Sequence, residues 1–191
     1  LWRFLEESAR RFPQNVALEF LGKTLSYQEL WGLARRFAQG LKDLGVRPGD
    51  RVAIMLPNSP QFVIAFYGTL LAGGVGVNTN PMYTPRELHH QLRDAGARFL
   101  VILDQLLPRY LEVEKEVPVK RVVVTGIQDY LPFPKNLLYP LKAKRDGLPL
   151  GFPKREGFHA FAELLKRPPA EPHVPDPEDL ALLQYTGGTT G

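Results

Sequence analysis

Short apolar runs alternate along this chain with helix-start signals, and this alternation restricts the possible folds more than any other feature. Two of the helix signals, Ser59-Pro60 and Thr84-Pro85, place an N-cap before a first-turn proline. The apolar runs have the length and composition of buried strands and cover residues 52–56, 75–77, 99–103 and 122–125. This order predicts an α/β fold, with a largely parallel sheet flanked by helices and right-handed crossovers.

A capping box predicts the longest helix. Ser26 is followed three residues later by Glu29, so each side chain is placed to bond the backbone N–H of the other. We expect a helix over residues 27–44, with Gly45 at its carboxyl end. Shorter helices are expected over residues 105–116 and 158–166.

The composition narrows the class of protein. The chain has 191 residues and no cysteine, which excludes disulfides and thiol catalysis within it and fits a cytoplasmic protein. No apolar run is long enough to span a bilayer, and the first residues are typical of an amphipathic helix and not of a signal peptide. The net charge of +4 does not indicate nucleic-acid binding, so we expect no nucleic-acid partner. The four histidines lack metal-ligand spacing.

The end of the chain combines an apolar run with a loop of only two residue types. Residues 180–183 have the pattern of a buried strand, and residues 186–191 are all Thr or Gly. Such a loop is either an ordinary turn or a nest of backbone N–H groups that holds an anion. Because ligands of parallel sheets bind at the carboxyl ends of strands, the phosphate interpretation is favoured. The loop is not a Walker P-loop, since no Gly-Lys-Ser/Thr ending follows.

Two segments interrupt the alternation. Residues 127–157 are rich in proline, aromatics and leucine, with Lys142, Lys144 and Arg145 clustered together. We expect an irregular surface excursion, and a peripheral membrane contact is the alternative interpretation, with leucines at the interface and cations on anionic headgroups. Residues 168–177 form a proline-rich connector to the last strand.

Three motifs together resemble a known family. Tyr185-Thr-Gly-Gly-Thr-Thr-Gly191 is similar to the phosphate loop of the acyl-adenylate-forming (AMP-binding) enzymes, and Leu25-Ser-Tyr-Gln-Glu-Leu30 and Leu70-Leu-Ala-Gly-Gly-Val-Gly-Val-Asn-Thr-Asn-Pro81 resemble two of their core motifs. Within the family, residues 78–88, 131–142 and 179–188 most resemble bacterial long-chain fatty-acid CoA ligases. The resemblance implies that residues 1–191 form the first part of the large N-terminal domain and stop inside the phosphate loop.

The resemblance also implies the chemistry. A fatty acid and ATP would form acyl-AMP and pyrophosphate, and coenzyme A would then take the acyl group; ATP and Mg²⁺ are the implied cofactors. Thr186 would contact the phosphates and Mg²⁺, while Gly187, Gly188, Thr189, Thr190 and Gly191 would wrap the phosphates. No catalytic residue is implied within this piece, because the family's loop lysine, adenine pocket and C-terminal domain lie downstream. We therefore expect the piece alone to be inactive.

Two alternatives remain open at this point. One is an adenylating ligase for another carboxylate, such as an aryl or short-chain acid, because the specificity residues of the family lie mostly beyond Gly191. The other is a membrane or protein-interaction module that keeps the fold without catalysis. The resemblance makes a homodimer a further expectation, in a protein that is cytoplasmic or membrane-associated.

Overall fold

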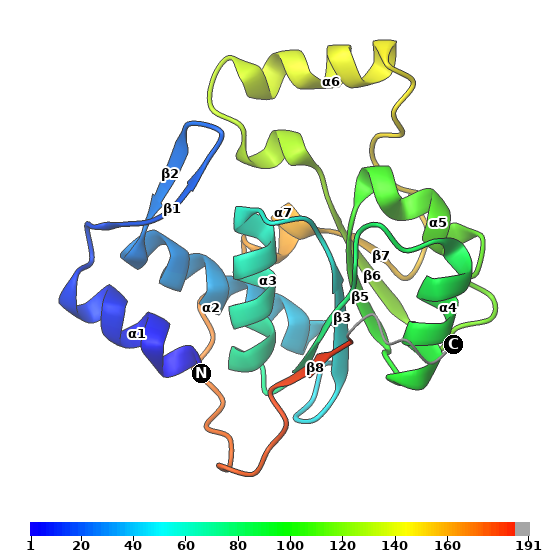
Figure 1. Ribbon diagram of the computed structural model, residues 1–191. Coiled ribbons are helices and arrows are strands. Elements are labelled where there is room, and N and C mark those ends of the chain that lie inside the picture. The colour runs from blue at the N-terminus through cyan, green and yellow to red at the C-terminus, as the bar shows by residue number, and fades with distance from the viewer. Residues whose placement is uncertain (186–191) are drawn as a thin grey trace.

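The computed structural model describes residues 1–185, which form a parallel sheet covered by helices on both faces (Figure 1). The elements in chain order are α1 (Trp2–Arg11), β1 (Val16–Phe20), β2 (Lys23–Ser26), α2 (Tyr27–Asp43), β3 (Arg51–Met55), α3 (Pro60–Leu71), β4 (Val75–Asn78), α4 (Pro85–Asp94), β5 (Phe99–Leu103), η1 (Asp104–Leu106), α5 (Leu107–Leu111), β6 (Arg121–Thr125), η2 (Ile127–Tyr130), α6 (Lys135–Arg145), β7 (Phe158–Ala160), α7 (Phe161–Leu164) and β8 (Leu182–Gln184).

The sheet confirms the predicted α/β class. Its strands lie in the order β7-β6-β5-β3-β4-β8, and each neighbouring pair is parallel. After β3 the chain moves to one side to form β4, and after β5 it moves to the other side to form β6. All carboxyl ends therefore meet at one edge, and the strand order reverses between β3 and β5, which is where sheets of this kind bind ligands. β1 and β2 form a separate antiparallel hairpin.

Alternate residues of each central strand pack into two different cores. In β3, Val52 and Ile54 join the core made with α2, α3 and α7, whereas Ala53 and Met55 join the core made with α4 and α5. All four side chains are fully buried. Burial on both faces explains why the strand sequences are continuous apolar runs and not alternating ones.

The predicted helix caps are present. Ser26 Oγ accepts from the N–H of Glu29 at 3.2 Å, and the Glu29 carboxylate accepts from the N–H of Ser26 at 2.8 Å. Thr84 and Glu87 make the same reciprocal pair at the start of α4. These bonds also explain why the pKa of each glutamate is lowered, since the backbone N–H groups stabilise the ionised form.

The prediction of a helix over residues 158–166 is wrong in its first third. Residues Phe158–Ala160 form β7, which pairs with Val122–Val124 of β6, and the helix α7 begins only at Phe161. A pairing partner distant in the sequence outweighs the local preference here.

The helix predicted over residues 105–116 is also shorter than expected. It consists of η1 and α5 and ends at Leu111. A longer helix would place the like charges of Glu112 and Glu116 four residues apart on one face, which is unfavourable.

Residues 127–157 are more ordered than the expected irregular excursion. They contain η2 and the 11-residue helix α6, and Figure 1 shows α6 at one end of the molecule, above η2. Pro140 lies inside α6, and proline in a helix interior is normally unfavourable, so composition alone argued against a helix here. No helix within residues 1–185 combines the length and apolar composition that a bilayer span requires.

The helix-to-strand turn before β4 depends on a glycine. Gly73 has φ of +87°, a backbone conformation that residues with a side chain rarely adopt. At Gly76, by contrast, an added Cβ would lie 3.6 Å from Leu182, which is ordinary contact. The turn therefore requires Gly73, whereas close packing does not require Gly76.

Candidate functional site

β8 ends at the carboxyl edge of the sheet, just before the predicted loop in the sequence. It pairs in parallel with β4, with Asn78 opposite Gln184, and the Asn78 amide donates to Gln184 Oε1 at 2.8 Å. The buried strand expected over residues 180–183 is confirmed only in part, because β8 covers Leu182–Gln184 at the edge of the described sheet and its two leucines are half-buried. The described chain thus ends one residue after the edge where parallel sheets bind ligands.

The predicted phosphate-binding residues themselves are outside the described part of the chain. They are Thr186, Gly187, Gly188, Thr189, Thr190 and Gly191. Of the motif that begins at Tyr185, the structure describes Tyr185 only. The phosphate and Mg²⁺ roles of the six residues stay predictions.

A side-chain hydrogen bond joins Tyr185, the residue after β8, to helix α4. Its phenol O–H donates to the carboxylate of Asp94, the last residue of α4. Burial, together with this hydrogen bond and the Asp94 charge, raises the pKa of Tyr185 to about 12. The phenol is therefore neutral and acts as a donor at physiological pH.

Side chains of α4 and α5 hold the end of β4 and the loop that follows it. The Arg109 guanidinium donates to the carbonyls of Pro81 at 2.6 Å and Tyr83 at 3.0 Å, and the Gln91 amide donates to the carbonyl of Asn78 at 2.9 Å. These bonds order the chain directly beside the end of β8. Sequence reasoning missed Arg109, Gln91 and Asp94, because their partners are distant along the chain and no local pattern marks them.

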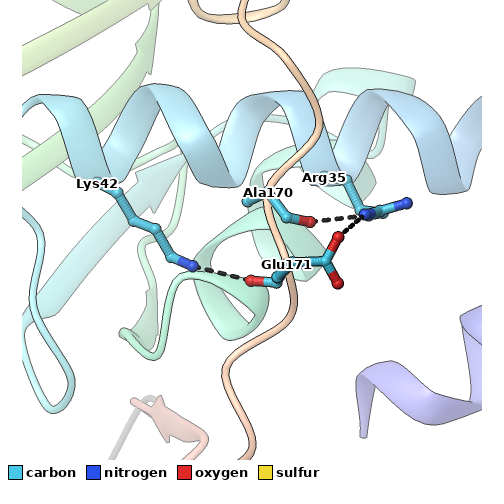
Figure 2. A network of polar contacts seen from close by, with 4 residues as sticks. All are labelled: Arg35, Lys42, Ala170 and Glu171. Atoms are coloured by element: carbon cyan, nitrogen blue, oxygen red, sulfur yellow. Dashed lines mark hydrogen bonds and ion pairs between the residues drawn. The ribbon is translucent and has the colours of Figure 1, made fainter.

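The connector before β8 lies along α2. Arg35 Nε donates to the Ala170 carbonyl at 2.8 Å, its Nη2 pairs with the Glu171 carboxylate at 2.9 Å, and Lys42 Nζ donates to the Glu171 carbonyl at 2.9 Å (Figure 2). Residues 168–177 contain no helix or strand. Bonds to side chains of α2 thus determine the path of the connector. The connector leads to β8, which lies at the edge of the sheet opposite β7.

A second polar cluster lies at the carboxyl ends of β5 and β6. Thr125 Oγ1 donates to Asp129 at 2.9 Å, and the Gln61 amide donates to the Gly126 carbonyl at 2.9 Å. The buried Asp104 carboxylate accepts from the N–H of Gln105 at 2.8 Å. Because these groups bond mainly to one another and to nearby backbone, the cluster joins η1 and η2 to the sheet.

Acidic and histidine side chains do not gather into a metal-binding group of three or more anywhere in residues 1–185. Asp94, the carboxylate that contacts Tyr185, accepts its phenol hydrogen bond. The one predicted Mg²⁺ ligand, Thr186, lies beyond the described residues, so its role stays a prediction.

Comparison with known proteins defines the class of protein. The family model of the AMP-binding enzymes matches residues 5–191, so the chain belongs to the AMP-binding enzyme family. It is similar to a long-chain-fatty-acid–CoA ligase of Bacillus subtilis (strain 168), with 44% identity over all of this chain and 35% of that protein. The chain thus spans about a third of the length of the curated relatives it matches.

Solved structures show the same fold. An anthranilate CoA ligase in complex with anthranoyl-AMP matches all of this chain and 32% of its own, with a TM-score of 0.81 and 24% identity. A long-chain-fatty-acid-CoA ligase from Archaeoglobus fulgidus matches all of this chain and 35% of its own, with a TM-score of 0.77 and 25% identity. The six-stranded parallel sheet is therefore that of the N-terminal domain of adenylate-forming enzymes.

Proposed function

We propose that this chain supplies the phosphate-binding part of an AMP-forming ligase that joins a long-chain fatty acid to coenzyme A. The structural observation that carries the proposal is the parallel pairing of β8 with β4, which ends β8 at the ligand-binding edge of the sheet. The long-chain acid is supported by the 44% identity to the Bacillus subtilis ligase over the whole chain.

The proposed reaction has two steps. A carboxylate is a poor acyl donor because its oxygen is a bad leaving group. Attack of the carboxylate on the α-phosphorus of ATP makes that oxygen part of AMP, a good leaving group, and releases pyrophosphate. The thiol of coenzyme A then attacks the acyl carbon and displaces AMP.

The first step develops negative charge on the phosphates, and the proposed role of this chain is to stabilise that charge. Backbone N–H groups of residues 186–191 and the hydroxyls of Thr186, Thr189 and Thr190 would donate to phosphate oxygens. A Mg²⁺ ion, when bound, would neutralise part of the phosphate charge. The bonds of Arg109 and Tyr185 would keep the neighbouring β4 loop and the end of β8 in place.

Carboxylate-dependent ATP–pyrophosphate exchange tests the proposal. The substrate series runs from acetate to palmitate and includes benzoate, with the 191-residue chain and a polypeptide extended to the length of the relatives. We expect exchange with long-chain acids by the extended polypeptide and none by the 191-residue chain. Thr186→Val should lower exchange at least about tenfold by removing one donor, whereas Thr24→Val, at an exposed hairpin position, should not change it.

The other outcomes would revise the proposal in different ways. Exchange only with benzoate would support the adenylation mechanism and reject the fatty-acid substrate. The anthranilate ligase has the same fold, so the fold does not distinguish aromatic acids from fatty acids as substrates. A folded extended polypeptide that binds ATP without exchange would favour a non-catalytic module. The homodimer stays a prediction, to be tested by the mass of the protein in solution.

A further inference from the structure

Helix α6 presents an apolar stripe to solvent. Large apolar side chains on this stripe and directly before it are between 58% and 79% exposed, and they are Phe133, Leu137, Leu138 and Leu141. The three leucines lie three or four residues apart, or adjacent, and so share one side of the helix. The opposite side faces the protein, where Ala143 is buried and the Gln105 amide donates to the Tyr139 hydroxyl. In Figure 1 this helix forms one end of the molecule.

Cations flank the stripe on both sides. At helical spacing, Lys135 and Lys142 lie on one side of the leucines, Lys144 lies on the other, and Arg145 ends the helix. All four are exposed. Among residues 1–185, Arg145 pairs with Asp146 at 3.4 Å, whereas Lys142 and Lys144 make no ion pair. The positive charge of these lysines is thus not neutralised by the described protein.

The tip of the β1–β2 hairpin extends the same surface. Leu21 stands at the tip with φ of +54°, a conformation that is uncommon for a residue with a side chain, and its side chain is exposed. Lys135 Nζ donates to the Leu21 carbonyl at 3.4 Å, so the tip lies beside the start of α6. Asn or Gly is the usual residue at such a turn position, and here an exposed leucine stands beside the start of α6.

We propose that this α6 surface, made of Leu21, Phe133, Leu137, Leu138 and Leu141 with the cations Lys135, Lys142, Lys144 and Arg145, docks on an anionic lipid surface. An apolar stripe with basic side chains on both sides and at its end matches a helix that lies in the headgroup plane, with leucines toward the acyl chains and lysines on the phosphates. α6 has only 11 residues, each adding about 1.5 Å to its length, so the helix is short. Its contact with the lipid surface is therefore weak and reversible. The inference does not depend on the ligase activity.

Vesicle flotation of the 191-residue chain tests the docking. Vesicles of phosphatidylcholine alone are compared with vesicles containing 30% phosphatidylglycerol (about one lipid in three), in low salt and in about 0.15 M salt. We expect binding to the anionic vesicles that weakens with salt. The charge variant Lys142→Glu/Lys144→Glu/Arg145→Glu should lose binding at least about tenfold. Its matched control, Arg86→Glu/Lys115→Glu/Lys120→Glu, makes the same change of charge at exposed positions elsewhere and should bind much better than the charge variant.

An apolar variant separates docking from general charge attraction. Leu137→Gln/Leu138→Gln/Leu141→Gln keeps all cations and changes only exposed positions, so the fold should remain, as circular dichroism would show. We expect this variant to lose most binding in about 0.15 M salt. The proposal is overturned if the chain binds neither vesicle, if both α6 variants bind like the unchanged chain, or if the control loses as much as the charge variant. Unchanged binding of both variants would indicate that α6 is covered by protein instead.

Discussion

At the scale of single residues, Asp104 is unusual because its carboxylate is buried. Only 2% of the residue is exposed, and among residues 1–185 the other buried polar side chains are uncharged. Burial raises the pKa of Asp104, and hydrogen bonds from the N–H groups of Gly151 and Gln105 offset part of that effect. The folded protein therefore binds a proton at Asp104 at a higher pH than the unfolded chain does.

This difference predicts the sign of a pH effect on stability. Between the unfolded pKa of about 4 and the raised folded pKa, the folded state holds more protons, so the Asp104 contribution to stability falls as pH rises. We compare the free energy of unfolding of the unchanged protein with that of the Asp104→Asn variant. The unchanged protein should gain stability relative to the variant as pH is lowered from 7 toward 4. Urea denaturation at a series of pH values measures it. The same series for Asp146→Asn, at an exposed position, should show a smaller change, and an opposite slope for Asp104→Asn would contradict the assignment.

At the scale of elements, the fit of α7 against α2 depends on one glycine. A Cβ added at Gly40 would overlap the Leu164 side chain and lie 3.0 Å from Leu164 Cα, whereas one added at Gly32 in the same helix would meet nothing within 4 Å. Both glycines are in α2, so the intrinsic cost of glycine in a helix is similar for the two.

The two glycines should therefore respond to alanine in opposite directions. Gly32→Ala should raise the free energy of unfolding by about 0.5–1 kcal/mol, because alanine favours the helix. Gly40→Ala should lower it by about 1–3 kcal/mol, because overpacking against the α7 backbone exceeds that gain. Chemical denaturation of both variants measures the difference, and stabilisation by Gly40→Ala would show that α7 moves away at little cost.

At the scale of the whole molecule, the connector 168–177 links distant parts of the fold. Besides its bonds to Arg35 and Lys42, the N–H of His173 donates to the Leu71 carbonyl at 2.9 Å, and the Trp2 indole donates to the His173 carbonyl at 3.1 Å. The segment thus contacts α1, α2 and α3 before β8 joins the sheet. The position of the candidate site therefore depends on contacts far from it.

Removing Arg35 should loosen this segment. Arg35→Ala deletes the bond from the charged guanidinium to the Ala170 carbonyl and the bond to the Glu171 carboxylate. The variant should therefore lose about 1–3 kcal/mol of unfolding free energy. Amide hydrogen exchange at Ala170 and His173 should increase with it. Glu171→Ala is the control: its side chain is 91% exposed, so loss of this surface ion pair should cost less than about 1 kcal/mol. Equal effects of the two variants would mean that the carboxylate, and not the backbone bonds, holds the connector.

Some particular features could be predicted and others could not. The capping box at Ser26 and the N-caps at Ser59 and Thr84 are predictable because the capping partners lie within three residues. The strand β7 is not, because its partner in β6 lies about 36 residues earlier. The bond between Tyr185 and Asp94 spans 91 residues, and the bond between Arg109 and Tyr83 spans 26 residues, so no local sequence pattern predicts either bond. The six residues of the predicted phosphate loop lie outside the described part of the chain.

The α/β class, the helix starts and the family resemblance follow from the sequence alone, because apolar periodicity, caps and turns depend on neighbours a few residues apart. The strand order, the place of β8 at the sheet edge, the path of the connector and the outward face of α6 come from tertiary contacts. These features depend on pairings between residues far apart in the chain, where the free energy of burial and hydrogen bonding outweighs local preference.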